Sequence, residues 1–291
     1  MGLKIFLNGN FVEKEDAMVS VFDHGLLYGD GVFEGIRSYN RRVFRLMEHL
    51  ERLYSGAEAI RLEIPMTKEE LKNKVIETLK INDLDNAYIR LVVTRGSGDL
   101  GLDPRECKNP SLFIIADKIA LYPKKFYETG LPITVAKTRR NHPMSLSPKV
   151  KSLNYLNNIL GRIDAIDAGT EEALMLTIDG YAVECTGDNI FIVSGGKLIT
   201  PESGLGALTG ITQKAVIELA KKRGIKTEWD SEMSLEKIYG ASECFLTGTA
   251  AEIIPVIKIS EHVIGDGKPG EVARALLKDF RELAKVDGVE Y

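Results

Sequence analysis

The chain has 291 residues, of which 44% are hydrophobic and 27% charged, and its formal net charge is −4. This length suits two domains of modest size, each large enough for a hydrophobic core. The slightly acidic balance gives no reason to expect nucleic acid as a partner, and no apolar run approaches the roughly 20 residues that cross a bilayer. The apolar stretch within residues 1–8 is too short for a secretory signal. The sequence therefore predicts a cytoplasmic location and no membrane partner.

The cysteines and histidines form no metal-binding or disulfide pattern. Cys107, Cys185 and Cys244 stand far apart, outside any CxxC or Cys/His spacing, and the four histidines are scattered singly. We therefore expect no bound metal. Gln213 is the only glutamine, whereas lysine and glutamate are plentiful, and this bias favours a thermophilic source.

The first half of the chain, residues 1–121, has the pattern of a small α/β domain. Its elements in order are a hairpin that turns at Asn8-Gly9, a helix, a second helix opened by the capping box Thr67-Lys68-Glu69-Glu70, and two strands. We expect the first helix over 46–62 and the two strands over 87–94 and 111–116. Residues 122–130 lose this periodicity and are predicted to form an interdomain loop.

Residues 131–291 are predicted to form the larger domain. A strand over 132–136 and a proline-containing loop lead into a helix that runs from Asn154 to a stop at Gly169. Apolar side chains repeat along this helix at helical spacing: Leu156, Ile159, Leu160, Ile163 and Ile166. A β-meander follows over 173–200, and then a helix over 212–222. An antiparallel meander flanked by helices favours an α+β, barrel-like domain over a doubly wound parallel fold, and no GxGxxG follows a strand to suggest a dinucleotide site.

Lys151 is the first candidate for chemistry. It lies between a proline-bounded loop and the predicted helix, where the positive end of a helix dipole would favour its neutral, nucleophilic amine. The alternative is a solvated lysine in a basic loop, which is the commoner case for any single lysine.

Glu184 is the second candidate, because it ends a predicted strand directly after a tight turn. A carboxylate on a rigid strand can keep a pyridine nitrogen protonated, as cofactor chemistry of the pyridoxal type requires. The alternative is an edge-strand glutamate that faces water, and the residues alone leave the two interpretations even.

Three further segments could bind phosphate. Gly210-Ile211-Thr212 opens a helix, whose first N–H groups form a ready anion site, although ordinary N-caps are far more common. Gly248-Thr249-Ala250 would let a ligand approach the backbone closely. Arg52 could form a two-pronged phosphate contact, or it could be a surface helix charge.

In this order, these segments resemble the class IV (fold-type IV) aminotransferases, which depend on pyridoxal 5′-phosphate. The chain is most similar to the branched-chain aminotransferases of archaea and bacteria. Seven segments along nearly the whole length carry the resemblance: 23–37, 48–53, 87–90, 151–155, 184–191, 210–212 and 248–252. The resemblance implies an α+β fold of two domains, with a small α/β N-terminal domain and a larger barrel-like β domain with flanking helices.

The resemblance also implies roles for cofactor-binding residues. Lys151 would hold pyridoxal phosphate as a Schiff base and act as the acid and base of proton transfer. Tyr155 would bind the ring hydroxyl and Glu184 the pyridine nitrogen. The phosphate group would be held by residues of several segments: Arg52, Gly210, Ile211, Thr212, Gly248 and Thr249.

The substrates implied are the L-branched-chain amino acids and 2-oxoglutarate. Tyr88, with the backbone of Thr249 and Ala250, would receive the α-carboxylate. Arg90 would reach the distal carboxylate of glutamate together with Tyr28, the latter from a neighbouring subunit, since the family forms at least homodimers. Phe33 and Gly35 would line the side-chain pocket.

Alternatives remain open at this point. A D-amino-acid aminotransferase or an aminodeoxychorismate lyase would share Lys151 and Glu184, and a non-enzymatic anion-binding module could use the basic loop around Lys149. Two residues depart from the family pattern: Cys185 follows Glu184 where glycine is usual, and Gln213 replaces a basic residue. Tyr122 neighbours the position of a family tyrosine and is not assigned a role.

Overall fold

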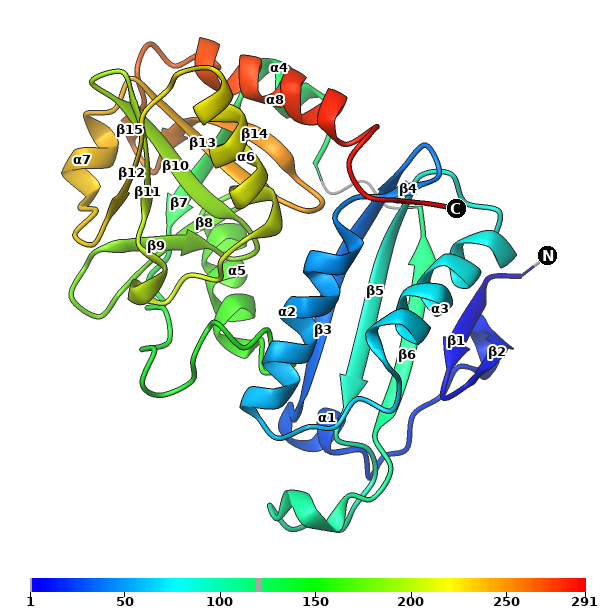
Figure 1. Cartoon of the computed structure of the whole chain (residues 1–291). Coiled ribbons are helices and arrows are strands. Elements are labelled where there is room, and N and C mark those ends of the chain that lie inside the picture. Colours follow the sequence, from blue (N-terminus) through cyan, green and yellow to red (C-terminus); the bar gives the residue numbers. More distant parts are fainter. Residues whose placement is uncertain (1, 119–121) are drawn as a thin grey trace. The chain divides into compact units, whose positions relative to one another are not determined.

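The computed structural model describes residues 2–118 and 122–291, which form two compact units (Figure 1). The first unit contains the described residues up to 118 together with 150–155 and 284–291. The second contains 122–149 and 156–283. Two segments from later in the chain therefore pack with the N-terminal part, and one of them carries Lys151.

The first unit is built on a seven-stranded sheet with the order β16-β4-β3-β5-β6-β1-β2, in which every pair is antiparallel. Its strands are β1 (Lys4–Leu7), β2 (Asn10–Glu13), β3 (Gly31–Tyr39), β4 (Arg42–Val43), β5 (Ala87–Thr94), β6 (Ser111–Asp117) and β16 (Val289–Glu290). Its helices are α1 (His24–Tyr28), α2 (Leu46–Ala59) and α3 (Lys68–Ile81), with 3-10 turns at Lys14–Asp16 and Pro104–Glu106.

The local signals in this unit are confirmed. Asn8 and Gly9 both have positive φ, 47° and 95°, as the predicted hairpin turn requires. Thr67 Oγ1 accepts a hydrogen bond from the Glu70 backbone N–H at 3.3 Å, and Glu70 Oε2 accepts one from the Thr67 N–H at 2.7 Å, so the capping box is complete.

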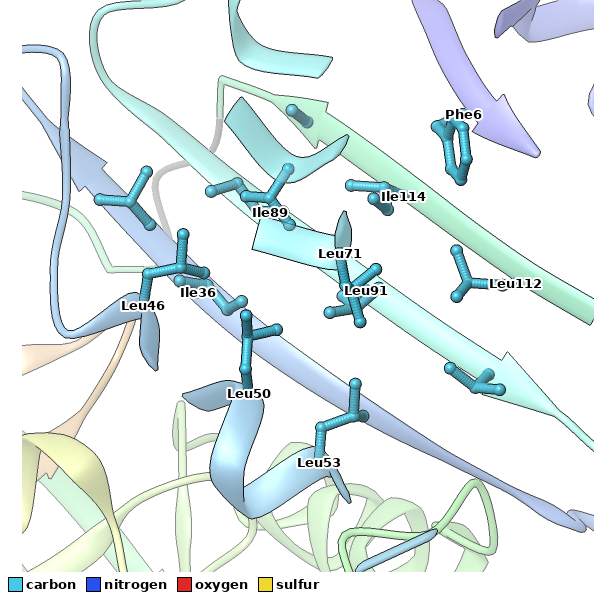
Figure 2. Close-up of a cluster of buried hydrophobic side chains, with 14 of the residues drawn as sticks. Phe6, Ile36, Leu46, Leu50, Leu53, Leu71, Ile89, Leu91, Leu112 and Ile114 are labelled. Atoms are coloured by element: carbon cyan, nitrogen blue, oxygen red, sulfur yellow. The ribbon is translucent and has the colours of Figure 1, made fainter. Parts of the chain in front are cut away.

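Helices α2 and α3 cover one face of this sheet (Figure 1). Figure 2 shows the core between them, where side chains of both helices meet those of the strands. Because side chains alternate along a strand, Val32, Glu34 and Ile36 of β3 point to this core, and Phe33 and Gly35 point to the opposite face. The second face of β3 is therefore available for a site.

The second unit is built on a curled, mixed sheet with the order β12-β11-β10-β13-β14-β7-β8-β9, and β15 pairs with β14. Strand β9 also packs against β10 and β11, so the two ends of the sheet approach each other, and the predicted barrel-like shape is confirmed. The β7–β8, β7–β14 and β11–β12 pairs are parallel, which the predicted antiparallel meander did not include.

The strands of the second unit are β7 (Leu131–Val135), β8 (Ala173–Leu176), β9 (Ala182–Cys185), β10 (Asn189–Ser194), β11 (Lys197–Pro201), β12 (Thr227–Asp230), β13 (Glu243–Gly248), β14 (Glu252–Ile259) and β15 (His262–Val263). Its helices are α4 (Lys125–Thr129), α5 (Leu156–Asp167), α6 (Ile211–Lys222), α7 (Leu235–Tyr239) and α8 (Glu271–Leu283), with a 3-10 turn at Ser203–Leu205. The segment predicted as an interdomain loop thus contains the short helix α4.

Helix α5 forms where the sequence predicts it, but its apolar side chains face outward. The side that packs on the unit consists of Asn158, Gly161 and Ala165. The five apolar residues at helical spacing are 44–62% exposed: Leu156, Ile159, Leu160, Ile163 and Ile166. Across residues 2–118 and 122–291, no helix combines the length and apolar character that a membrane crossing needs.

Candidate functional site

The segment that carries Lys151 is held by backbone pairing to the edge of β3. The Phe33 N–H donates to the Lys151 carbonyl at 3.0 Å, and the Leu153 N–H donates to the Gly31 carbonyl at 2.9 Å. Ser152 forms the bridge to Val32 between them. Lys151 therefore lies between the loop and α5, as the sequence predicted, but five residues before the helix begins and on a strand-like segment.

The amine of Lys151 lies among aromatic groups. Its Nζ donates to the Tyr155 hydroxyl at 2.9 Å and lies 4.5 Å from the centroid of the Phe33 ring. The Phe33 and Tyr155 rings meet edge to face at 5.0 Å. The backbone and two rings thus fix the amine, in an environment unlike that of a freely solvated lysine.

The predicted substrate residues of β3 and β5 gather beside Phe33. Gly35 and Arg90 are cross-strand neighbours, and Arg90 Nη2 donates to the Tyr88 hydroxyl at 3.3 Å. The Arg90 guanidinium also lies 4.7 Å from the Phe33 ring centroid. A Cβ at Gly35 would come within 2.0 Å of the Tyr88 hydroxyl oxygen, so only glycine fits beneath that ring. Phe33, Gly35, Tyr88 and Arg90 therefore form one group with Lys151.

Tyr28 lies elsewhere on the same unit. It ends α1, its hydroxyl donates to the Leu100 carbonyl at 2.6 Å, and its side chain packs edge to face on His24. Within the described residues, no hydrogen bond or ring contact joins the Tyr28 side chain to the Lys151 group.

Arg52 of α2 is not a surface charge. Its Nε donates to Glu34 Oε1 at 2.7 Å and its Nη2 to Glu34 Oε2 at 2.8 Å, and His49 Nδ1 lies 2.7 Å from the same Oε2. Burial by itself would raise the pKa of Glu34, but the Arg52 charge, His49 and their hydrogen bonds outweigh it and lower the pKa to about 2. Burial lowers the pKa of His49, although Glu34 opposes this shift.

Sequence reasoning missed Glu34 and His49 as functional candidates. A usable signal was present, because Glu34 occupies a core-facing position of β3 between Val32 and Ile36. A carboxylate at such a position requires buried partners.

In the second unit, Glu184 is buried and paired with a cation. Arg140 lies with its Nη2 2.9 Å and its Nε 3.0 Å from Glu184 Oε1, and Glu184 Oε2 accepts a hydrogen bond from the Leu208 N–H at 3.0 Å. Arg140 also donates to the side-chain oxygens of Asn157 and Asn158. The water-facing alternative for Glu184 is wrong. Arg140, in a loop without periodicity, was not identified from the sequence.

The start of α6 carries Gly210, Ile211 and Thr212 as predicted, with Gly210 as the N-cap. The Gly210 N–H donates to Gln213 Oε1 at 3.2 Å, and Gln213 Nε2 donates to Thr200 Oγ1 at 3.1 Å. Gln213 is buried, so the departure from a basic residue replaces a charge with a neutral link between the helix start and β11.

The hairpin between β13 and β14 brings Gly248, Thr249 and Ala250 to a tight turn, in which Gly248 pairs with Glu252. A Cβ at Gly248 would lie 1.9 Å from Asp188 Oδ1, just as a Cβ at Gly210 would lie 2.1 Å from Asn189 Oδ1. The 185–189 loop therefore holds both glycine segments. Cys185 begins this loop at the position where the family usually has glycine, and its side chain is buried in the core.

The groups of each unit have the chemistry that would bind a phosphorylated pyridine aldehyde. The first unit presents a fixed amine, a phenol and an arginine. The second presents a buried carboxylate and the start of a 12-residue helix, whose first N–H groups have no partner within the helix. The Thr247 hydroxyl is buried without a partner there. An aldehyde, a protonated ring nitrogen and a phosphate dianion match these donors and acceptors.

Comparison with known proteins agrees with this chemistry. The family described as "Amino-transferase class IV" matches residues 31–259. A protein of Methanocaldococcus jannaschii, provisionally assigned as a branched-chain-amino-acid aminotransferase, is 50% identical over 288 residues and covers 99% of each chain. The crystal structure of the Escherichia coli branched-chain amino acid aminotransferase is 35% identical with a TM-score of 0.94, covering 97% of this chain and 95% of that one. The branched-chain enzyme of Thermobaculum terrenum, in its holo form with pyridoxal phosphate, is 30% identical with a TM-score of 0.87, covering 97% and 94%.

The Arg140–Glu184 pair generates a stability prediction. Arg140→Met leaves the Glu184 carboxylate buried without its cation, and we expect a loss of about 3–5 kcal/mol in the free energy of unfolding. The double variant Arg140→Met/Glu184→Met should recover most of that loss, because it removes both charges. Calorimetric melting of the cofactor-free variants measures both effects.

The control is Arg162→Met, which removes the exposed pair with Glu171 and should cost at most about 1 kcal/mol. If Arg140→Met had the same melting temperature as the control variant, the Arg140–Glu184 pair would not contribute to stability as predicted.

Proposed function

Because this chain belongs to the class IV aminotransferases, we propose that it transfers amino groups between L-branched-chain amino acids (leucine, isoleucine and valine) and 2-oxoglutarate, with pyridoxal 5′-phosphate as cofactor. The observation that carries the proposal is the Lys151 amine, held by Tyr155 and Phe33 on the sheet face that also bears Tyr88 and Arg90. The names of the relatives from Methanocaldococcus jannaschii and Escherichia coli support the substrate class, and the holo form of the Thermobaculum terrenum enzyme supports the cofactor.

The residues assigned to the cofactor would each bind a different group of it. When bound, it supplies an electron sink that weakens the Cα–H bond of the amino acid. Lys151 would anchor it through its amine, Tyr155 would bind the ring hydroxyl, and Glu184 would hold the ring nitrogen protonated. The phosphate would be bound by Arg52 and by two backbone turns: Gly210, Ile211 and Thr212 in one, Gly248 and Thr249 in the other.

Lys151 moves the proton. Its amine would take the proton from the substrate Cα and release it two atoms further along, at the carbon that joins the substrate nitrogen to the cofactor ring. Positioned transfer of this kind contributes about 10²–10⁴-fold to a rate. The Tyr155 hydroxyl, 2.9 Å from Nζ, limits where the amine can lie. Arg140 Nη2 lies 2.9 Å from Glu184 Oε1, so Arg140 fixes the orientation of the carboxylate that would hold the cationic ring nitrogen.

The face of β3 and β5 would provide for two kinds of substrate, the branched-chain amino acids and glutamate. The Phe33 ring would offer an apolar wall to a branched side chain, and Gly35, which leaves room for the Tyr88 hydroxyl, would line the same pocket. Tyr88, with the backbone of Thr249 and Ala250, would receive the α-carboxylate. Arg90, which lies over Phe33, would meet the distal carboxylate of glutamate, with Tyr28 of a neighbouring copy beside it.

A donor panel tests the substrate assignment. With 2-oxoglutarate as acceptor, we expect L-leucine, L-isoleucine and L-valine to form L-glutamate and 2-oxo acids, and L-alanine to react poorly. Activity with D-leucine and formation of D-glutamate would instead select a D-amino-acid aminotransferase. Pyruvate release from aminodeoxychorismate without an amino acceptor would select the lyase.

Lys151→Ala should fold but lose transamination by at least about 10²-fold, because no other amine replaces the proton carrier. Lys149→Ala, which changes an exposed lysine two residues earlier, is the matched control and should retain activity. Single-turnover absorbance after addition of L-leucine measures both. A Lys151→Ala protein that stays yellow and active would refute the assignment.

We propose that the enzyme is at least a homodimer and that the outward face of α5 lies in the subunit contact. Its five aliphatic side chains form one row at the spacing i, i+3, i+4, i+7 and i+10, each about half exposed. Monomers rarely expose large contiguous apolar patches, so an apolar row on an exposed helix face favours an interface. A two-fold contact would bury the same row on both copies.

Ile163→Asp places a charge in the middle of this row and should convert the protein to a folded monomer of 32.2 kDa, as measured by light scattering. Ile178→Asp, at a hairpin turn where the native side chain is 64% exposed, should leave the assembly unchanged. If both variants keep the native mass, α5 is outside the interface. A cytoplasmic location and a thermophilic source remain part of the proposal.

A further inference from the structure

Three ionisable side chains lie together inside the first unit. Glu34 is fully buried on β3, His49 on α2 is 1% exposed, and the Arg52 side chain on α2 is 15% exposed. His49 and Arg52 are three residues apart, so they share a helix face. That face otherwise consists of apolar core residues: Leu46, Leu50 and Leu53.

A buried cluster of charges is weak evidence for a role in stability. Replacing a buried ion pair by well-packed apolar side chains is commonly neutral or stabilising, because burying charges costs desolvation energy. An apolar residue at position 34 would continue the core pattern of Val32 and Ile36. The cluster therefore has another use, and Arg52 is its only member with appreciable exposure.

We propose that Glu34 and His49 are positioning residues that fix the Arg52 guanidinium in one orientation for the phosphate of the cofactor. The inference rests on the proposed function, which assigns Arg52 to the phosphate. It adds two residues that act on the cofactor only through Arg52.

The geometry supports this role. Two nearly parallel hydrogen bonds, of 2.7 and 2.8 Å, fix both the position and the plane of the guanidinium, which one bond could not do. His49 Nδ1 contacts the carboxylate at Oε2 and so limits its rotation. Glu34 remains ionised at any pH well above its pKa of about 2, so its carboxylate can accept both hydrogen bonds from Arg52 throughout the neutral range.

The test is the affinity of the cofactor-free protein for two probes, pyridoxal 5′-phosphate and unphosphorylated pyridoxal, followed by absorbance. Glu34→Gln keeps the size of the side chain but presents an amide N–H to one arm of the guanidinium. We expect its dissociation constant for pyridoxal 5′-phosphate to rise about 10- to 100-fold, by analogy with the loss of residues that support metal ligands, and that for pyridoxal to stay unchanged. A merely structural role would weaken both probes.

A double-variant cycle shows whether the effect passes through Arg52. Arg52→Ala should weaken pyridoxal 5′-phosphate alone, and Glu34→Gln should then add nothing further. His49→Phe removes one contact to the carboxylate and should give a smaller loss in the same direction, which serves as a second variant if Glu34→Gln fails to fold. Asp30→Asn is the matched control, because Asp30 forms a similar two-pronged pair with Arg95 in the same unit and should not affect either probe.

Two outcomes overturn the inference. One is a Glu34→Gln loss that is equal for both probes, and the other is a loss that persists in the Arg52→Ala background. The failure of the proposed function is distinguishable, because then the unaltered protein would bind neither probe. If Arg52→Ala bound pyridoxal 5′-phosphate normally, this result would refute both the phosphate role of Arg52 and the inference that rests on it.

Discussion

The backbone pairing between residues 151–153 and the first residues of β3 is the constraint on which the site depends. It brings a segment from the middle of the chain to the N-terminal unit and leaves the Lys151 side chain over Phe33. This edge is open because β4 is only two residues long and pairs with the far end of β3. The turn that precedes β4 contains two residues with positive φ, Asn40 and Arg41. A longer β4 would occupy the main-chain groups that now hold the lysine segment.

Strand β3 separates two environments within a few residues. Phe33 and Gly35 belong to the face that carries the amine and the substrate groups, whereas Glu34 reaches into the core to Arg52. Alternation along a strand makes both possible from consecutive positions. The same alternation explains why the strand is sensitive at each position: a side chain at Gly35 would strike Tyr88, and a neutral residue at 34 would release Arg52.

Local signals in the sequence predicted the elements well, because hairpin turns, capping boxes and helical spacing act over a few residues. Asn8-Gly9, Thr67–Glu70 and the start of α6 are examples. The family resemblance supplied Lys151, Tyr155, Glu184 and the glycine turns. Partners that come from distant segments were missed, since nothing in the 139–142 stretch marks Arg140 as the cation of Glu184. The outward face of α5 was also unpredictable, because helical spacing shows that an apolar face exists but not what covers it.

The two departures from the family pattern show which positions of the second unit tolerate a different residue. Gln213 can replace a basic residue because it satisfies both the Gly210 N–H and the Thr200 hydroxyl, so no buried group loses its partner. Cys185 can replace glycine because its small side chain is absorbed by the core at the end of β9. Gly210 and Gly248 have no such freedom, since Asn189 and Asp188 occupy the space that a Cβ would need. Gly210 and Gly248 are therefore glycines because the Asn189 amide and the Asp188 carboxylate leave no room for a side chain. The 185–189 loop thus restricts which residues the two turns can contain.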